Sequence, residues 1–200
     1  PIFGPGSIAR NMAATVRAMD SVAPYAVASR EISRAREFAA RYGFEKAYGS
    51  YREMIDDPAV DLVYIATPHA FHAEQMLQCL EGGKHVLCEK AFTKTADEAK
   101  KVLALAREKG LLAAEAIWPR YMPMAKTLRD FCTSGKIGKI HGLACNLGYP
   151  VSHVERLREP ALAGGGLLDV GVYTLHFASL VMGNAIKDVA SAALLSDRGV

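Results

Sequence analysis

Three observations predict an α/β fold: a doubly wound parallel sheet followed by an incomplete α+β domain with an open mixed sheet. First, short apolar runs alternate with helical patterns in the first half of the 200-residue chain. Second, a glycine-rich turn separates the first apolar residues from the first helical pattern. Third, the alternation gives way after Trp118 to longer excursions between strands, so we expect a second domain there.

The strands expected in the first half are short and largely apolar. After a remnant at the start of the chain they cover residues 25–28, 47–48, 61–66, 85–88 and 111–117. The run at 61–66 is continuously apolar after Asp61, which is typical of a strand covered on both faces. In such parallel sheets, ligands bind outside the carboxyl ends of the strands.

Helices fill the intervals between these strands, at 8–19, 32–42, 72–80 and 96–109. In the second of them, apolar residues recur at helical spacing and Gly43 marks its end. Thr95 and Glu98 form a capping box at the start of the last. Beyond Trp118 we expect helices at 122–132 and 168–181, and strands at 140–149 and 189–195.

These elements suggest two domains: residues 1–118 as a doubly wound α/β domain with a truncated first strand, and residues 119–200 as the start of a second, truncated α+β domain. The chain opens at Pro1 without an initiator methionine, and it stops at Val200 where a hairpin turn is expected. We therefore expect a fragment of a longer protein.

Charge, hydropathy and cysteine spacing indicate which partners and sites are not expected for this protein. The net charge is only +3 and is spread along the chain, so neither nucleic acid nor an anionic membrane is an expected partner. We see no apolar run of membrane-spanning length. The cysteines Cys79, Cys88, Cys132 and Cys145 form no CxxC pair, so we expect a reduced, cytoplasmic chain without a metal site.

The stretch Gly4-Pro5-Gly6-Ser7-Ile8-Ala9 fits G-x-G-x-x-A, a pattern that lets a backbone approach a pyrophosphate at a helix N-terminus. A plain strand-to-helix turn is the alternative, but the flanking strand and helix favour dinucleotide binding. The expected cofactor contacts in this stretch are Gly4, Gly6, Ser7, Ile8 and Ala9.

Ser29 and Arg30 follow the second strand, where an NAD-binding protein would place an acidic residue for the ribose hydroxyls. A serine and an arginine can instead bind the 2′-phosphate of NADP. Glu31 is adjacent and keeps NAD open as the alternative. We expect NADP.

Polar residues also follow the strand at 61–66. Thr67 could cap or touch the cofactor ribose, and Pro68 stops the strand. Both are expected cofactor contacts. We include His72 among the expected cofactor contacts, although both it and His69 also fit a purely structural role. Neither histidine has partners at the spacing of metal ligands.

Glu89 and Lys90 lie side by side at a predicted strand end, where burial is costly unless they face a polar ligand. Downstream, Asp169 and Tyr173 share a helix face, with His176 one turn beyond. A tyrosine can act as general acid or base when a nearby cation stabilises its phenolate, and Lys90 could be that cation. Taken alone, Tyr173 also fits a half-buried helix residue and Asp169 a cap.

Five ordered motifs, GPGSIAR, YIATPHAFH, HVLCEKAF, EAIWPRYMP and GGGLLDVGVY, carry a resemblance. The chain resembles the glucose–fructose oxidoreductase/inositol dehydrogenase (Gfo/Idh/MocA) family. It is most similar to the branch of dimeric dihydrodiol dehydrogenases, which includes NADP-dependent D-xylose dehydrogenases. The resemblance implies a Rossmann domain, a C-terminal sheet often used for dimerisation, and a homodimer as the expected assembly.

The resemblance also assigns residues. Glu89-Lys90 matches a Glu-Lys-Pro signature whose lysine is catalytic, with Ala91 in place of the proline. Asp169 and Tyr173 match an Asp-x-x-x-Tyr pattern, and Trp118 matches an aromatic residue lining the substrate and nicotinamide pocket. We expect Glu89, Lys90, Trp118 and Arg120 to contact the cofactor.

Together these observations predict an NADP-dependent oxidoreductase acting on a hydroxyl of a sugar or cyclic diol. Tyr173 takes the hydroxyl proton, Lys90 holds the substrate oxygen, and Asp169 orients Lys90 or a second hydroxyl. Two alternatives stay open: an enzyme of the same family acting on a keto-sugar or amino-sugar nucleotide, and a sensor that binds NADP without turnover.

Overall fold

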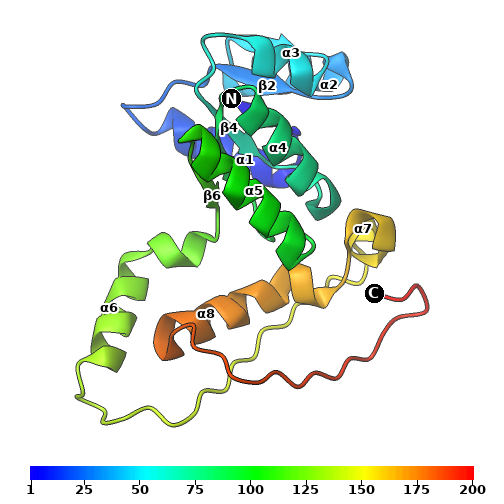
Figure 1. Ribbon diagram of the computed structural model, residues 1–200. Helices are drawn as coiled ribbons and strands as arrows, with labels where there is room; N and C mark the ends of the chain where they lie inside the picture. The colour runs from blue at the N-terminus through cyan, green and yellow to red at the C-terminus, as the bar shows by residue number, and fades with distance from the viewer. The chain divides into compact units, whose positions relative to one another are not determined.

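A computed structural model describes residues 1–200 and divides into two compact units, Pro1–Ala116 and Ile117–Val200 (Figure 1). The first holds every strand of the structure, and the second is helical with long irregular segments. Each unit is described by itself below.

The first unit is built on one parallel sheet with the strand order β3-β2-β1-β4-β5-β6. The order reverses direction between β1 and β4, and this switch point is where doubly wound sheets bind their ligands. The predicted Rossmann sheet is confirmed. Its strands are β1 (Ile2–Phe3), β2 (Ala26–Ala28), β3 (Lys46–Tyr48), β4 (Leu62–Ile65), β5 (His85–Cys88) and β6 (Ala113–Glu115).

Helices connect these strands much as the sequence pattern predicts. They are α1 (Ser7–Arg17), α2 (Ile32–Tyr42), α3 (Tyr51–Asp56), η1 (His69–Phe71), α4 (His72–Glu81) and α5 (Ala96–Lys109). Gly43 ends α2 in the left-handed conformation, with φ 74°. The Thr95 hydroxyl caps α5 by accepting the Glu98 N–H. The short helix α3, which the sequence analysis missed, is capped in the same way by Ser50.

Helices cover both faces of this sheet, because neighbouring strand residues point to opposite sides. Phe3 packs with residues of α3, α4 and α5, while its neighbour Ile2 packs with residues of α1 and α2. Both side chains are almost completely buried. The two apolar layers fix the sheet, and hence the carboxyl-end edge at which the candidate site lies.

The second unit is helical in this structure. It contains η2 (Trp118–Tyr121), α6 (Pro123–Thr133), α7 (Glu155–Arg158), η3 (Pro160–Leu162), η4 (Leu167–Gly171) and α8 (Val172–Met182). The expected helix at 168–181 is present, but its first turn, η4, is a π-helix. Such wide turns are frequent at functional sites.

The strands expected at 140–149 and 189–195 are not formed, so that part of the expected mixed sheet is a wrong prediction for this structure. Figure 1 draws both segments as irregular chain. The physical reason is that a strand needs a hydrogen-bonded neighbour. Neither segment has a paired strand here, whatever its alternating pattern suggests.

One segment also departs from the expected lack of membrane-spanning stretches. Residues Pro160–Met182 are long and apolar enough to cross a membrane by length and composition. This is weak evidence, because the same segment holds Asp169, which is buried and paired with Arg156. A charged pair of this kind is costly to place in lipid.

Candidate active site at the carboxyl ends of the strands

The glycine-rich turn lies at the switch point of the sheet. Gly4 has φ 82°, and a Cβ atom there would lie 2.9 Å from the Thr67 Cγ2 atom. Its N–H donates to the Ala28 carbonyl at 3.1 Å, so the turn is tied to the ends of both neighbouring strands. No side chain caps α1 at Gly6. The first N–H groups of α1 are therefore not capped by a side chain, as at anion sites on helix N-termini.

The end of β2 presents a buried serine followed by an exposed arginine. The Ser29 hydroxyl accepts the Glu31 N–H at 3.2 Å, and the Arg30 guanidinium lies 5.7 Å from the centre of the Phe71 ring. Burial raises the pKa of Tyr51, and the charges of Arg30 and Arg34 oppose that rise. The sequence analysis missed Arg34; its position in the first turn of the helix that follows Ser29 and Arg30 is the signal that could have found it.

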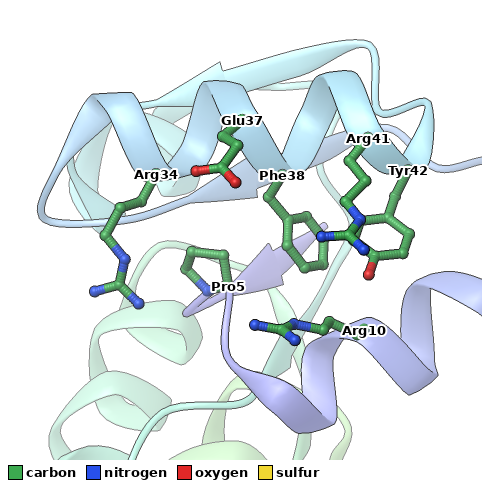
Figure 2. Close-up of a pocket in the computed structure, with 7 residues that line it drawn as sticks. All are labelled: Pro5, Arg10, Arg34, Glu37, Phe38, Arg41 and Tyr42. Atoms are coloured by element: carbon green, nitrogen blue, oxygen red, sulfur yellow. The ribbon is translucent and has the colours of Figure 1, made fainter.

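A pocket of about 140 Å³ opens between α1 and α2 beside the glycine-rich turn (Figure 2). In the figure Pro5 lies at its centre, with Arg34 towards one end and Arg10 and Arg41 towards the other. Three arginines against a single acidic residue, Glu37, give the pocket a positive character. Its full lining is Pro5, Arg10, Arg34, Glu37, Phe38, Arg41 and Tyr42.

The end of β4 is held by side chains of α4. The Thr67 hydroxyl donates to the Gln75 Oε1 atom at 2.6 Å. His72 is completely buried, and its Nε2 and Nδ1 atoms lie 2.8 Å from the carbonyl oxygens of Thr67 and Ala91. Burial is the main reason that the pKa of His72 is lowered. With no exposed surface and both nitrogens against backbone carbonyls, His72 holds the backbone that follows β4 and β5. That it also touches the cofactor stays a prediction.

The end of β5 carries Glu89 and Lys90, both half-buried. The Tyr64 hydroxyl donates to the Glu89 carboxylate. Burial is the largest effect on both groups, and it raises the pKa of Glu89 and of Tyr64. The Lys90–Ala91 peptide bond is cis. A buried acid beside a lysine at a strand end is the kind of perturbed pair that is common in functional sites.

Glu115, the last residue of β6, is a further polar group at this edge that the sequence analysis missed. Its Oε1 atom accepts the Phe92 N–H at 2.9 Å. Burial raises the pKa of Glu115, and the hydrogen bond from Phe92 works against that rise. Glu115 opens the motif EAIWPRYMP, but the motif does not reveal this contact, because the partner is a backbone N–H 23 residues away.

The second unit gathers the remaining predicted residues around η4 and α8. The Asp169 carboxylate, in the π-helical turn, pairs with the Arg156 guanidinium at 3.2 Å. The Trp118 Nε1–H donates to the Tyr173 hydroxyl at 3.1 Å, and the two rings meet edge to face. The sequence analysis did not include Arg156 among the site residues.

His176 and Arg120 belong to the same unit. The His176 Nε2 atom is buried and has no hydrogen-bond partner. Burial lowers the pKa of His176, and the charge of Arg120 lowers it further. Arg120, an expected cofactor contact, lies in η2 two residues after Trp118.

Two family descriptions match the chain. Residues 1–116 match the oxidoreductase family GFO/IDH/MocA with an NAD-binding Rossmann fold, and residues 125–199 match the GFO/IDH/MocA C-terminal domain. The first match alone covers more than half of the 200 residues.

Curated relatives point to one kind of enzyme. Trans-1,2-dihydrobenzene-1,2-diol dehydrogenase of Bos taurus is 44% identical over 167 residues, which are 84% of this chain and 50% of the relative. The Homo sapiens enzyme of the same name is 42% identical over 79% of this chain and 47% of its own length. The chain thus spans about half the length of these relatives.

Solved structures agree on the architecture. KijD10, a 3-ketoreductase from Actinomadura kijaniata solved with NADP and TDP-benzene, has a TM-score of 0.84 at 33% identity. It matches 91% of this chain and 56% of its own. A levoglucosan dehydrogenase solved with NADH and levoglucosan has a TM-score of 0.78 at 26% identity, over 91% of this chain and 53% of its own.

Proposed function

Because this chain belongs to the GFO/IDH/MocA oxidoreductase family, we propose that it carries the cofactor domain and part of the substrate site of an NADP-dependent oxidoreductase. The observation that carries the proposal is the glycine-rich turn at the switch point of the sheet, with Lys90 at the end of a strand on the same edge. A dinucleotide bound across that edge would have its pyrophosphate at the start of α1.

The preference for NADP is proposed from the end of β2. No carboxylate occupies position 29 or 30 there, and Arg30 and Arg34 are close enough together to influence the same tyrosine. Two guanidinium groups beside a serine suit a 2′-phosphate, while an NAD site would use an acidic residue. KijD10 was solved with NADP, whereas the levoglucosan dehydrogenase was solved with NADH, so NAD is the alternative to be measured.

The proposed reaction joins a nicotinamide cofactor to a hydroxyl or carbonyl carbon of a sugar or cyclic diol. The bound nicotinamide supplies hydride acceptance in the oxidative direction. Tyr173 accepts the hydroxyl proton, and the Lys90 ammonium stabilises the resulting charge on oxygen. The Trp118 indole N–H already donates to the Tyr173 oxygen, which is a contact that favours the phenolate.

Asp169 is proposed to orient Lys90 or a second substrate hydroxyl. Its carboxylate is buried and paired with Arg156, and Asp169 lies four residues before Tyr173. Glu89 is proposed to shape the nicotinamide site, and Trp118 and Arg120 to line it. The whole protein is proposed to act in the cytoplasm as a homodimer.

A cofactor and substrate screen tests this proposal. The whole protein is incubated with NADP or NAD and a panel of sugars and cyclic diols, and reduced cofactor is followed by its fluorescence. We expect turnover with at least one polyhydroxy substrate and a higher kcat/KM with NADP. Tight NADP binding without turnover or isotope exchange on any substrate would identify a sensor and overturn the proposal.

A further inference from the structure

One peptide group next to Lys90 is bound at both of its polar atoms by side chains from other elements. The Ala91 carbonyl oxygen lies 2.8 Å from the Nδ1 atom of His72, the first residue of α4. The N–H of the same peptide, that of Phe92, donates to the Glu115 carboxylate at 2.9 Å. We call His72 and Glu115 together the Ala91–Phe92 clamp.

The clamp also joins three strand ends. His72 reaches the Thr67 carbonyl after β4 with its second nitrogen, and Glu115 ends β6. The peptide they hold follows Lys90, which itself follows β5. Because β4, β5 and β6 are neighbours in the sheet, the clamp ties the turn that carries Lys90 to the strands on both sides.

Burial makes these contacts restrictive. His72 is completely buried and Ala91 is 3% exposed, so water cannot replace the ring at the carbonyl. A buried backbone group that loses its hydrogen-bond partner is destabilised by its uncompensated desolvation. The turn therefore has one strongly preferred arrangement as long as both side chains are present.

The alanine at position 91 explains why the turn needs a restraint from other elements. A proline there would fix its own φ, whereas alanine leaves the backbone after Lys90 more freedom. The His72 ring against the Ala91 carbonyl and the Glu115 carboxylate, which accepts the Phe92 N–H, supply the restraint from outside the turn. The Lys90 side chain starts from this turn, so the volume that its amine can reach depends on where the turn is held.

We propose that His72 and Glu115 are positioning residues that hold the Ala91–Phe92 peptide at both polar atoms and thereby fix the Lys90 amine for catalysis. This inference rests on the proposed function, in that Lys90 is taken as the catalytic lysine. Neither side chain needs to touch the substrate or the cofactor.

A matched pair of variants at position 115 tests the clamp in the whole protein. Glu115→Gln keeps an oxygen acceptor for the Phe92 N–H, while Glu115→Met has a similar length and no such acceptor. We expect Glu115→Met to lower kcat about tenfold with little change in KM for NADP, since a misplacement of about 1 Å can cost up to about 100-fold. Glu115→Gln should keep turnover within about twofold of the native protein, an order-of-magnitude expectation.

His72→Phe tests the other half of the clamp, because it keeps a ring and removes both polar contacts. We expect it to lower kcat about tenfold with little change in KM for NADP, as in Glu115→Met. Asp57→Asn is the control: it disrupts a polar cluster at the other edge of the sheet, so it should lower the melting temperature without lowering kcat. If His72→Phe does not fold, the difference in kcat between Glu115→Gln and Glu115→Met decides whether the clamp positions Lys90.

The Lys90→Met background separates the clamp from the proposed function. With Lys90 absent, Glu115→Met should cause no further loss of turnover. Near-native turnover of Lys90→Met itself would show that the proposed function is wrong. A large loss in Lys90→Met together with native kcat in Glu115→Met would instead leave the function standing and overturn the clamp.

Discussion

In the first unit, polar clusters lie at both edges of the sheet, one near the amino ends and one at the carboxyl ends of the strands. The two clusters differ in the hydrogen-bond donors that their carboxylates have. Before the strands, the Asp57 carboxylate accepts hydrogen bonds from Tyr25, Tyr48, Lys46 and the Ala59 N–H. Its own carbonyl accepts from Lys84. After the strands, Glu89 accepts from Tyr64, and Glu115 accepts from the Phe92 N–H.

The pKa directions of the two edges are opposite. Hydrogen bonds, led by that from Tyr48, lower the pKa of Asp57. Burial raises the pKa of Glu89 and of Glu115. A carboxylate with many donors is a fixed structural anion, whereas half-buried carboxyls with raised pKa are common at catalytic sites. The protonation chemistry of such a cluster therefore depends more on which donors bind its carboxylates than on how many polar side chains the cluster contains.

The largest expected effect on cofactor affinity contrasts two glycines with positive φ. Gly4 and Gly43 both have positive φ, which costs an alanine about 1–2 kcal/mol. Only at Gly4 would a Cβ meet another atom closely, 2.9 Å from Thr67, whereas space around Gly43 is open. We expect Gly4→Ala to weaken NADP binding by about 10- to 100-fold, since each tenfold step is about 1.4 kcal/mol.

Gly43→Ala is the matched control and should lower the melting temperature while leaving NADP affinity within about twofold. Affinity is measured by titrating NADPH fluorescence against each variant. An equal loss of NADP affinity in both variants would mean that the glycine-rich turn matters for stability alone. The claim that this turn binds the cofactor would then be wrong.

A smaller effect is expected at the end of β2. Replacing Arg30 by alanine removes a charged hydrogen-bond donor, which is worth roughly 1.5–3 kcal/mol when it binds an anion. We expect KM for NADP to rise by about tenfold or more, while KM for NAD stays nearly unchanged. Arg34→Ala should act in the same direction. Equal losses with both cofactors would show that these arginines support the fold and do not bind a 2′-phosphate.

The smallest effect on activity is expected at Asp57. Its folded pKa lies below the unfolded value of about 4, so its stabilising contribution is present above that pH and is lost as the pH falls through the folded pKa. Asp57→Asn should therefore lower stability at neutral pH and flatten the decline in stability on acidification. Urea unfolding at several pH values below 5 measures this, and an unchanged acid dependence would contradict the assignment.

The sequence predicts the first unit well because its signals are local. Apolar periodicity and Gly43 define α2, Thr95 defines the start of α5, and the glycine pattern defines the switch-point turn. The helix α3 was missed because six residues are too few for a periodic pattern. Strands at 140–149 and 189–195 were wrongly expected, since alternation reports a preference but pairing depends on a partner elsewhere.

The site residues that sequence reasoning missed share a different property. Arg156 pairs with Asp169 across 13 residues, and Glu115 binds a backbone N–H 23 residues away. The Asp57 cluster draws its donors from positions between 25 and 84. No spacing rule connects such residues, because the fold alone brings them together. His72 was noticed for its type, but only the structure shows that its partners are backbone carbonyls.

The most direct test of the central claim is the turnover of Lys90→Met, Tyr173→Phe and the double variant in the whole protein. Groups that transfer a proton contribute about 10²- to 10⁴-fold in rate, and groups that act as one unit lose activity non-additively. We predict that each single variant loses turnover in that range, that the double variant is little worse, and that NADP affinity hardly changes in Tyr173→Phe. Near-native turnover of Tyr173→Phe with only a lower melting temperature would contradict the account.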